Sequence, residues 1–502
     1  MSLPLTPASA FEAYCDAFAK GDHLAMAELF TDDGVFEASS LDAPIRGKSN
    51  LAAQLRIIAN ACRDIHTDVR IAIEHGDRGH FEGSYTAEII GTGGKLDGSP
   101  HRIDFKFVAI VEMREGKISR LSEIFDTRPL HPEERQRVWT LNRRTPYWDG
   151  TVTAKAKEWS VYNNMYFPMI YSHTPYEDYA ALLEGVTLWD VGLERQTQLR
   201  GANAHAFLDY LCCRDMSDMQ VGDCRYSLVC DDHGKMMCDP VVLWPGEDII
   251  WLSHGSVDLT LWARGIVHGS DWNVEVCEPD VAPLQIQGPL SLKVMLKLCN
   301  ADLEGMKNYS CIITDVAGQS AVVSRTGWSG GYGFEVYPFS SDRAMELWQA
   351  ILDAGEEFAI KVTGPIVNRA IERGVTDTCY YSNSDMNALE DLGARLVDLD
   401  GETDFIGKQA LLKIREQGVK RHSVGLLFQE KVPRLEWFWD LQDPRGNPGE
   451  VRWATYSFEL QRYIGIAVVD KQVEIGELLD IDHPNGQCQA EVCKVPFIDR
   501  AD

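Results

Sequence analysis

The sequence has no long apolar run and is short of basic residues. No stretch approaches the roughly 18 consecutive apolar residues that a membrane helix needs. The first residues, Met1–Leu5, lack the basic and apolar segments of a secretion signal. Lysine and arginine number 48 against 76 aspartate and glutamate, which gives a formal net charge of −28. Because nucleic acids bind basic surfaces, we expect no nucleic-acid partner. From the missing apolar runs and secretion signal we expect a cytoplasmic protein without a membrane partner.

Signatures of metal and dinucleotide sites are missing as well. The 13 histidines include no HExxH pair, and His75 and His80 flank a polar turn where we expect them to be exposed. No strand-like run is followed by the glycine fingerprint of a dinucleotide site. The 13 cysteines are an odd number, and Cys212–Cys213 has no CxxC partner, so reduced thiols are expected. We expect no metal.

The first 128 residues are predicted to form a small α+β domain. Ser9 followed by Glu12 is typical of a helix N-cap, and apolar residues then recur at helical spacing. Residues 103–113 alternate between apolar and other residues, and Arg114–Lys117 is a hairpin signal that leads into a second strand. Helices followed by an antiparallel sheet indicate the α+β class.

The rest of the chain divides into three further predicted regions. Residues 129–158 crowd basic residues among prolines, which favours a solvated linker over a recognition arm. Strand-like and helical runs alternate over 159–430, including an amphipathic helix at Asp342–Gly355. Short apolar segments over 431–502, separated by a run rich in proline and glycine, predict a small antiparallel β unit.

Two motifs allow a functional or a purely structural interpretation. Gly327–Gly331 fits GxSxG, but the following Phe334–Tyr337 predicts a strand instead of the helix that a nucleophile elbow needs. A glycine-rich hairpin that lets a flat ligand approach the backbone fits better. Asp239 lies between apolar residues, where an unpaired carboxylate is costly, so it is either a site residue or an edge aspartate facing water.

Several motifs then appear in the order found in one family. They are Leu188–Val191, Ile286–Pro289, Ser324–Trp328, Gly333–Val336 and Asp404–Lys408. In this order they resemble the glycine-cleavage T-protein (aminomethyltransferase) family over about residues 159–500. Cys213–Ser217 and Asp239–Leu243 look most like its dimethylsulfoniopropionate demethylase branch.

The resemblance implies a tetrahydrofolate-dependent one-carbon transferase whose three subdomains surround a central folate channel. It implies Asp239 as the catalytic group and Glu335 and Arg369 in folate binding. We expect Tyr226, on the strand before Asp239, to line the same cavity as a cofactor-binding residue, and the aromatic residues Tyr166, Trp189 and Trp328 to pack around the substrate. Ser329–Gly331 and Ile371–Gly374 depart from the family pattern, and 376–385 looks longer than usual.

The first domain, at about residues 5–128, resembles the SnoaL-like cone-shaped α+β fold. That fold serves in lyases, isomerases, ligand pockets and dimers, so the likeness leaves its role open. We favour oligomerisation, as a homo-oligomer, or control of access over a second active site.

Three functions remain open from the sequence. The first is a demethylase that moves a methyl group from a small sulfonium, such as dimethylsulfoniopropionate, to tetrahydrofolate; its leaving thioether is neutral, so positioning and a carboxylate suffice. The second takes a methoxylated or methylenedioxy aromatic, whose leaving phenolate needs a proton donor. The third binds folate without catalysis.

Overall fold

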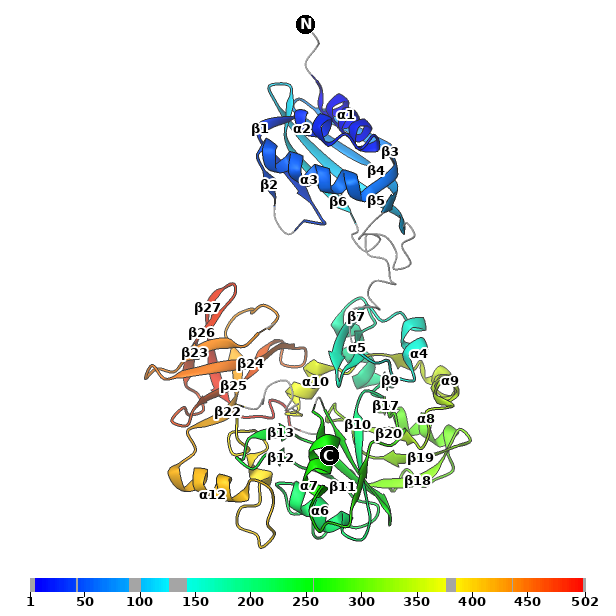
Figure 1. Ribbon diagram of the computed structural model, residues 1–502, viewed down its shortest axis with the longest axis vertical. Helices are drawn as coiled ribbons and strands as arrows, with labels where there is room; N and C mark the ends of the chain where they lie inside the picture. Colours follow the sequence, from blue (N-terminus) through cyan, green and yellow to red (C-terminus); the bar gives the residue numbers. More distant parts are fainter. Residues whose placement is uncertain are drawn as a thin grey trace. The chain divides into compact units, whose positions relative to one another are not determined.

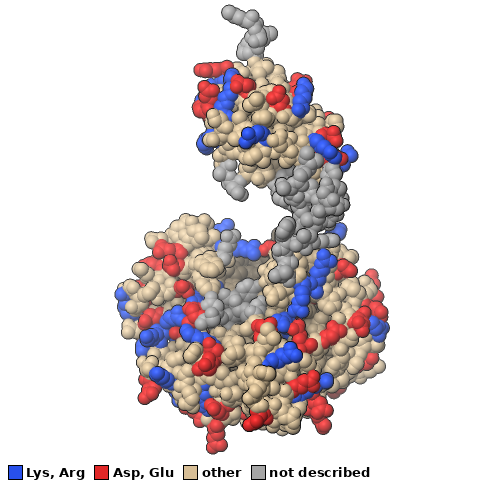
Figure 2. Space-filling model, viewed as in Figure 1, with Lys and Arg blue, Asp and Glu red and all other residues tan. Residues whose placement is uncertain are grey.

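The computed structural model describes residues 5–41, 44–89, 101–125, 142–255, 257–375, 385–435 and 437–499. The chain separates into two compact units, Met1–Leu141 and Asn142–Asp502 (Figure 1). Within the described residues, no helix is long and apolar enough to cross a membrane. On the face drawn in Figure 2, acidic and basic side chains are interspersed over both units.

The first unit is a six-stranded sheet with helices packed on it (Figure 1). Its helices are α1 (Pro7–Ala19), α2 (His23–Glu28) and α3 (Lys48–Ala61), and its strands are β1 (Phe30–Ala38), β2 (Ile45–Arg46), β3 (Cys62–His75), β4 (Arg78–Ile89), β5 (His101–Arg114) and β6 (Lys117–Phe125). The strand order is β2-β1-β6-β5-β4-β3, and only β1 and β6 run parallel. The α+β prediction is therefore confirmed.

Of two local predictions in this unit, the structure confirms the hairpin and corrects the helix N-cap. The hairpin is where we predicted it, because β5 ends at Arg114 and β6 begins at Lys117, with Glu115 and Gly116 at positive φ as a two-residue turn requires. The helix cap was wrong by three residues. Ser9 NH donates to the Thr6 hydroxyl at 3.3 Å, and Thr6 NH donates to the Ser9 hydroxyl at 2.8 Å. Proline is favoured in the first helical turn, so the helix begins at Pro7.

The second unit begins with a hairpin and a sheet that carries two helices. These elements are α4 (Trp148–Thr153), β7 (Glu158–Tyr162), β8 (Met165–Ile170), β10 (Arg195–Arg200), α6 (Ala204–Leu211), β11 (Cys224–Tyr226), β12 (Val229–Cys230), β13 (Met236–Cys238), β14 (Val241–Gly246), β15 (Ile249–His254), α7 (Leu259–Val267) and β16 (Glu275–Cys277). The sheet order is β11-β14-β15-β10-β16, and β12 pairs with β13. Phe207 of α6 and Leu259 of α7 are fully buried in its core.

A second, six-stranded sheet forms the other half of the body. Its elements are α5 (Pro175–Glu184), β9 (Thr187–Asp190), β17 (Leu284–Gln287), α8 (Ser291–Leu298), β18 (Cys311–Val316), β19 (Gln319–Ser324), β20 (Gly333–Pro338), α9 (Ala344–Gly355), β21 (Lys361–Val362) and α10 (Val367–Glu372), in the strand order β18-β19-β20-β17-β9-β21. The predicted amphipathic helix is α9, which buries Leu347 and Ile351. The strand predicted after the glycine-rich motif is β20.

The end of the chain forms a closed antiparallel barrel, as we predicted for this part. After α12 (Lys408–Gln417) come β22 (Arg421–Phe428), β23 (Trp439–Gln442), β24 (Pro448–Ser457), β25 (Arg462–Asp470), β26 (Leu478–His483) and β27 (Gly486–Cys493). The barrel order is β22-β25-β24-β23-β26-β27, so no strand edge stays open. The proline- and glycine-rich run connects β23 to β24.

Candidate active site

The second unit encloses a cavity of about 1350 Å³. Its wall is drawn from the β7–β8 hairpin, β11, the β13–β14 junction, β20, α10 and barrel strand β24. The lining therefore begins at Glu158 and ends at Pro496. A site assembled from both sheets and the barrel is typical of a ligand pocket between subdomains.

Asp239 faces this cavity from the junction of β13 and β14. Its neighbours Cys238 and Pro240 are buried, while Asp239 itself is half-buried and lines the cavity. The Tyr226 hydroxyl donates a 3.0 Å hydrogen bond to Asp239 Oδ2. Tyr226 lies opposite Val241 in the β11–β14 ladder, which brings its ring beside the aspartate. The structure thus places Asp239 at the cavity wall, and its role as a site residue stays a prediction.

Glu335 of β20 is a second carboxyl at the cavity, and it is only 5% exposed. The Tyr337 hydroxyl donates to Glu335 Oε2 at 2.9 Å, and the Thr326 hydroxyl donates to the same oxygen. Burial raises the pKa of the Glu335 carboxyl, and these hydroxyl donors act in the opposite direction. Three polar groups of the glycine-rich hairpin region are thus fixed against one another at the cavity wall.

His254 is a cavity residue that the sequence did not reveal. Burial lowers the pKa of its imidazole to about 4, so the ring is neutral. Its Nδ1 lies 3.0 Å from the Gly255 carbonyl oxygen and donates to it, while Nε2 accepts from the Thr197 hydroxyl at 3.1 Å. A lone histidine at a strand end has no sequence signature, so only the fold places it here.

Among the predicted substrate residues, the structure brings only Trp328 to the cavity. Trp189 of β9 is completely buried and packs with Tyr179 and Ile366. The Tyr166 ring lies 5.3 Å from the ring of Trp148, on the opposite side of β8 from the cavity-lining Phe167. The strand that carries Tyr166 therefore does contribute to the wall, but through its alternate residues.

Arg369, predicted to bind folate, is turned away from the cavity. Val367 and Asn368 line it, whereas the Arg369 guanidinium donates to Glu372 Oε2 at 3.0 Å and also to Glu459. Residues three apart share one face of a helix, so Arg369 and Glu372 lie together on the side of α10 away from the cavity. The described contacts of Arg369 are structural, and its predicted folate contact stays untested.

The two segments that depart from the family pattern, Ser329–Gly331 and Ile371–Gly374, are in contact with each other. Gln287 Nε2 donates to the Ser329 hydroxyl at 2.7 Å, which fixes the turn, and Gly330 has a φ of +63°. A Cβ at Gly330 would lie 2.7 Å from Arg373 Cβ, so glycine is required there by space as well as by φ. In the predicted longer stretch, residues 376–384 lie outside the described residues.

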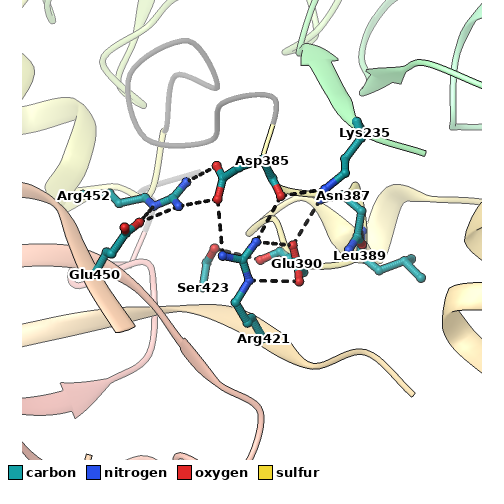
Figure 3. Close-up of polar contacts among 9 residues, drawn as sticks. All are labelled: Lys235, Asp385, Asn387, Leu389, Glu390, Arg421, Ser423, Glu450 and Arg452. Atoms are coloured by element: carbon teal, nitrogen blue, oxygen red, sulfur yellow. Dashed lines mark hydrogen bonds and ion pairs between the residues drawn. The ribbon is translucent and has the colours of Figure 1, made fainter. Parts of the chain in front are cut away.

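An ion-pair network joins the barrel to the strand that leads to Asp239 (Figure 3). The Asp385 carboxylate accepts from Arg452 Nη2 at 2.8 Å and from Arg421 Nη1 at 3.3 Å. Lys235, four residues before Asp239, donates from Nζ to the Asp385 carbonyl oxygen at 2.8 Å. Arg452 itself lines the cavity. This network, which also includes Glu390 and Glu450, links barrel strands β22 and β24 to the residue that precedes β13.

Metal ligation has no geometric support in the part of the chain that the structure describes. No group of three or more histidine, cysteine, aspartate or glutamate side chains there is placed to hold a metal ion.

Comparison with known proteins matches three family descriptions. The GCVT N-terminal domain matches residues 148–374, and the glycine cleavage T-protein C-terminal barrel domain matches residues 421–499. The SnoaL-like domain matches residues 11–121. Both resemblances drawn from the sequence are confirmed.

Individual relatives agree with these matches. Dimethylsulfoniopropionate demethylase DmdA of Ruegeria pomeroyi is 31% identical over 348 residues, covering 68% of this chain and 94% of that protein. Aminomethyltransferase of Bacillus subtilis is 28% identical over 340 residues, covering 64% and 91% respectively. Among solved structures, the glycine cleavage system aminomethyltransferase T from Bartonella henselae is similar with a TM-score of 0.65 and 18% identity, over 71% of this chain and 98% of that one. This last likeness shows the fold.

Proposed function

The chain belongs to the glycine cleavage T-protein (aminomethyltransferase) family, and on that premise we propose that it moves a methyl group from a small sulfonium, such as dimethylsulfoniopropionate, to tetrahydrofolate. It is an enzyme of tetrahydrofolate-dependent one-carbon transfer. One observation carries the choice of donor: Asp239, paired with Tyr226, presents a carboxylate inside a cavity bounded by aromatic rings. A sulfonium needs this environment, because its cation gains from both a carboxylate and aromatic faces.

The residues of the cavity fit tetrahydrofolate. A volume of about 1350 Å³ exceeds the upper range of roughly 1,000 Å³ typical of single-ligand pockets, which leaves space for a cofactor and a small donor together. The flat Trp328 and the glycine backbone at Gly327 offer a surface for a planar ring. The Glu335 carboxyl, fixed by Tyr337, would accept hydrogen bonds from ring N–H groups. When bound, tetrahydrofolate supplies the nitrogen that receives the methyl group.

The protein's own residues have two roles in this reaction, which are to stabilise the sulfonium and to accept a proton. Methyl transfer requires that the S–CH₃ bond break with its electron pair left on sulfur, and the bound cofactor would supply the nitrogen that takes the methyl group and gives up a proton. Asp239 stabilises the sulfonium before transfer and takes up that proton after it, while the Tyr226 hydroxyl holds the carboxylate in place at 3.0 Å. The thioether leaves uncharged, so no acid is required.

The same pair supports a second candidate, an aryl methyl ether as donor. Its phenolate leaving group needs a proton, and the Tyr226 hydroxyl is a cavity donor placed beside a carboxylate. The sulfonium and aryl ether reactions differ in their need for a proton. The thioether leaves without one, so only the ether reaction should depend on the Tyr226 hydroxyl to protonate its leaving group.

The decisive experiment incubates the purified protein with tetrahydrofolate and follows 5-methyltetrahydrofolate by mass spectrometry. The donor panel contains dimethylsulfoniopropionate, dimethylglycine and vanillate, with Asp239→Asn as the inactive control. We expect product from the sulfonium and its loss in the variant. Product from vanillate alone would replace the donor class, and folate binding without product from any donor would contradict methyl transfer.

A further inference from the structure

Five arginines line the described part of the cavity: Arg214, Arg225, Arg395, Arg434 and Arg452. Three of them are neutralised by carboxylates, since Arg225 pairs with Asp218, Arg434 with Glu158, and Arg452 with Asp385 and Glu450. Among the described residues, no carboxylate lies within 4.0 Å of Arg214 or Arg395. Arg395 is exposed, whereas Arg214 is half-buried. A half-buried guanidinium without a counter-charge is unusual, and an anionic ligand would neutralise its charge.

The backbone that carries Arg214 is held firmly. Cys213 NH donates to the Leu228 carbonyl oxygen at 2.8 Å, and the Cys213 carbonyl accepts from Asp398 NH at 2.8 Å. The Arg214 guanidinium is anchored as well, because Nη1 donates to the Tyr226 carbonyl oxygen at 2.8 Å. This bond uses one of the five N–H donors of the group. Arg214 is therefore positioned in advance, with donors to spare.

The charges around Arg214 add to this demand for an anion. Burial and the nearby Arg225 and Arg395 guanidinium groups lower the pKa of Arg214. Tyr309 and Asp218 act in the opposite direction, and the side chain of Asp218, which pairs with Arg225, is 75% exposed to solvent. A local excess of positive charge at a cavity wall is notable in a chain whose formal net charge is −28.

We propose that Arg214 binds the carboxylate of the methyl donor, so that the substrate is a methylated carboxylic acid. The inference rests on the proposed methyl transfer. It adds the residue that recognises the donor's carboxylate, at the end of the molecule away from the methyl group. Tyr226 links the two halves of the site, because its carbonyl holds Arg214 and its hydroxyl holds Asp239. A zwitterionic donor pairs with one anionic and one cationic group of the protein, and a guanidinium binds a carboxylate through two parallel hydrogen bonds.

The test compares each acid with its carboxamide in wild type and in Arg214→Gln and Arg214→Lys. The probes are dimethylsulfoniopropionate, dimethylglycine and vanillate, each with its amide. For whichever acid is turned over, we expect Arg214→Gln to raise KM by about 10- to 100-fold, as loss of a charged hydrogen-bonded partner does. The amide should show a KM that the variant leaves unchanged. Lysine should restore part of the affinity, and KM for tetrahydrofolate should stay constant.

Arg434→Gln is the matched control, since it removes one positive charge from the same cavity but from an arginine already paired with Glu158. An equal KM increase in this control would reduce the effect to general cavity charge and overturn the inference. So would equal turnover of acid and amide by wild type, or a KM shift in Arg214→Gln for tetrahydrofolate instead of the donor, which would assign the subsite to the glutamate of folate.

Failure of the proposed function would be recognised separately. If wild type makes no 5-methyltetrahydrofolate from any pair, methyl transfer is wrong. Equilibrium dialysis of the three radiolabelled acids then decides the carboxylate subsite by itself. Binding to wild type that weakens about tenfold in Arg214→Gln and not in Arg434→Gln supports the subsite, and binding that ignores Arg214, or no binding, overturns it.

Discussion

Each unit of the chain buries a glutamate beside a tyrosine hydroxyl, yet only one of these pairs faces the cavity. In the first unit, the Tyr85 hydroxyl donates to Glu123 Oε1 at 3.1 Å, and the Tyr85 ring stacks on Phe107 within the aromatic core. In the second, the Tyr337 hydroxyl donates to Glu335 Oε2 at 2.9 Å at the cavity wall. Burial raises both carboxyl pKa values. A raised carboxyl pKa therefore indicates burial and does not by itself mark a binding site. Whether the carboxyl can contact a ligand depends on whether it lines a cavity.

The largest difference in kcat between variants of the two units should come from substitution of Asp239. We expect Asp239→Asn to lower kcat by about 100- to 1,000-fold, within the range for loss of a group that transfers a proton. Single-turnover formation of 5-methyltetrahydrofolate measures this directly. Glu123→Gln, which changes the buried carboxyl of the other unit, is the control and should keep wild-type kcat. A large loss in the control would place chemistry in the first unit.

The Glu123 carboxyl should instead appear in the pH dependence of stability. Burial raises its pKa from the ordinary 4.5 to about 7. Between these values the folded chain keeps a proton that the unfolded chain has lost, so the free energy of unfolding falls as pH rises from 4.5 to 7. At about 1.4 kcal/mol per pKa unit, the total is about 3 kcal/mol.

Urea unfolding of wild type and Glu123→Gln at pH 4.5, 6 and 8 checks this expectation. The stability of the variant relative to wild type should increase across this range, because glutamine cannot ionise. Glu82→Gln, which alters an exposed carboxylate of β4 in the same sheet, should leave the wild-type pH dependence in place. A Glu123→Gln difference that stays constant with pH would contradict the buried state of this carboxyl.

Glu335→Gln should act on ligand binding. The amide keeps the size of the side chain but gives up the charge and one acceptor, so we expect the Kd for tetrahydrofolate to rise about tenfold. Quenching of tryptophan fluorescence, with Trp328 at the cavity, reports the affinity. Glu123→Gln should leave this Kd unaltered. An unchanged Kd in Glu335→Gln would remove Glu335 from the folate site.

The smallest effect is expected from removal of one hydroxyl. Tyr226→Phe loses the bond to Asp239 while keeping the ring, so kcat with a sulfonium donor should fall only about three- to tenfold. Tyr85→Phe removes the equivalent hydroxyl from Glu123 and should not change kcat. A loss of 100-fold or more with the sulfonium donor would contradict this holding role, whereas a loss of that size with an aryl methyl ether donor is what leaving-group protonation by the hydroxyl requires.

The sequence was most informative where local pattern and motif agreed. Alternation over 103–113 and the turn signal predicted the β5–β6 hairpin, and helical periodicity predicted α9. The order of family motifs indicated the fold and placed Asp239 and Glu335 at a common site, which the cavity brings together. Short-range patterns succeed here because each element buries one face only.

Prediction was poorer where an element is covered on more than one side. All four residues of β9 are buried, so no alternation marks Trp189 as core instead of cavity. On β8, the pattern could not tell which of the alternate residues Tyr166 and Phe167 faces inward. Arg214 became a candidate only when pairing of the other cavity arginines was known, since an absent counter-charge is a property of tertiary structure.

The cavity wall extends from Glu158 to Pro496, almost the whole length of the second unit. During synthesis, a nascent chain shorter than 496 residues lacks part of this wall and cannot enclose a ligand. A ligand that binds the complete cavity stabilises the folded state by mass action. Such a ligand adds stability at the stage when the segment that contains Pro496 completes the wall.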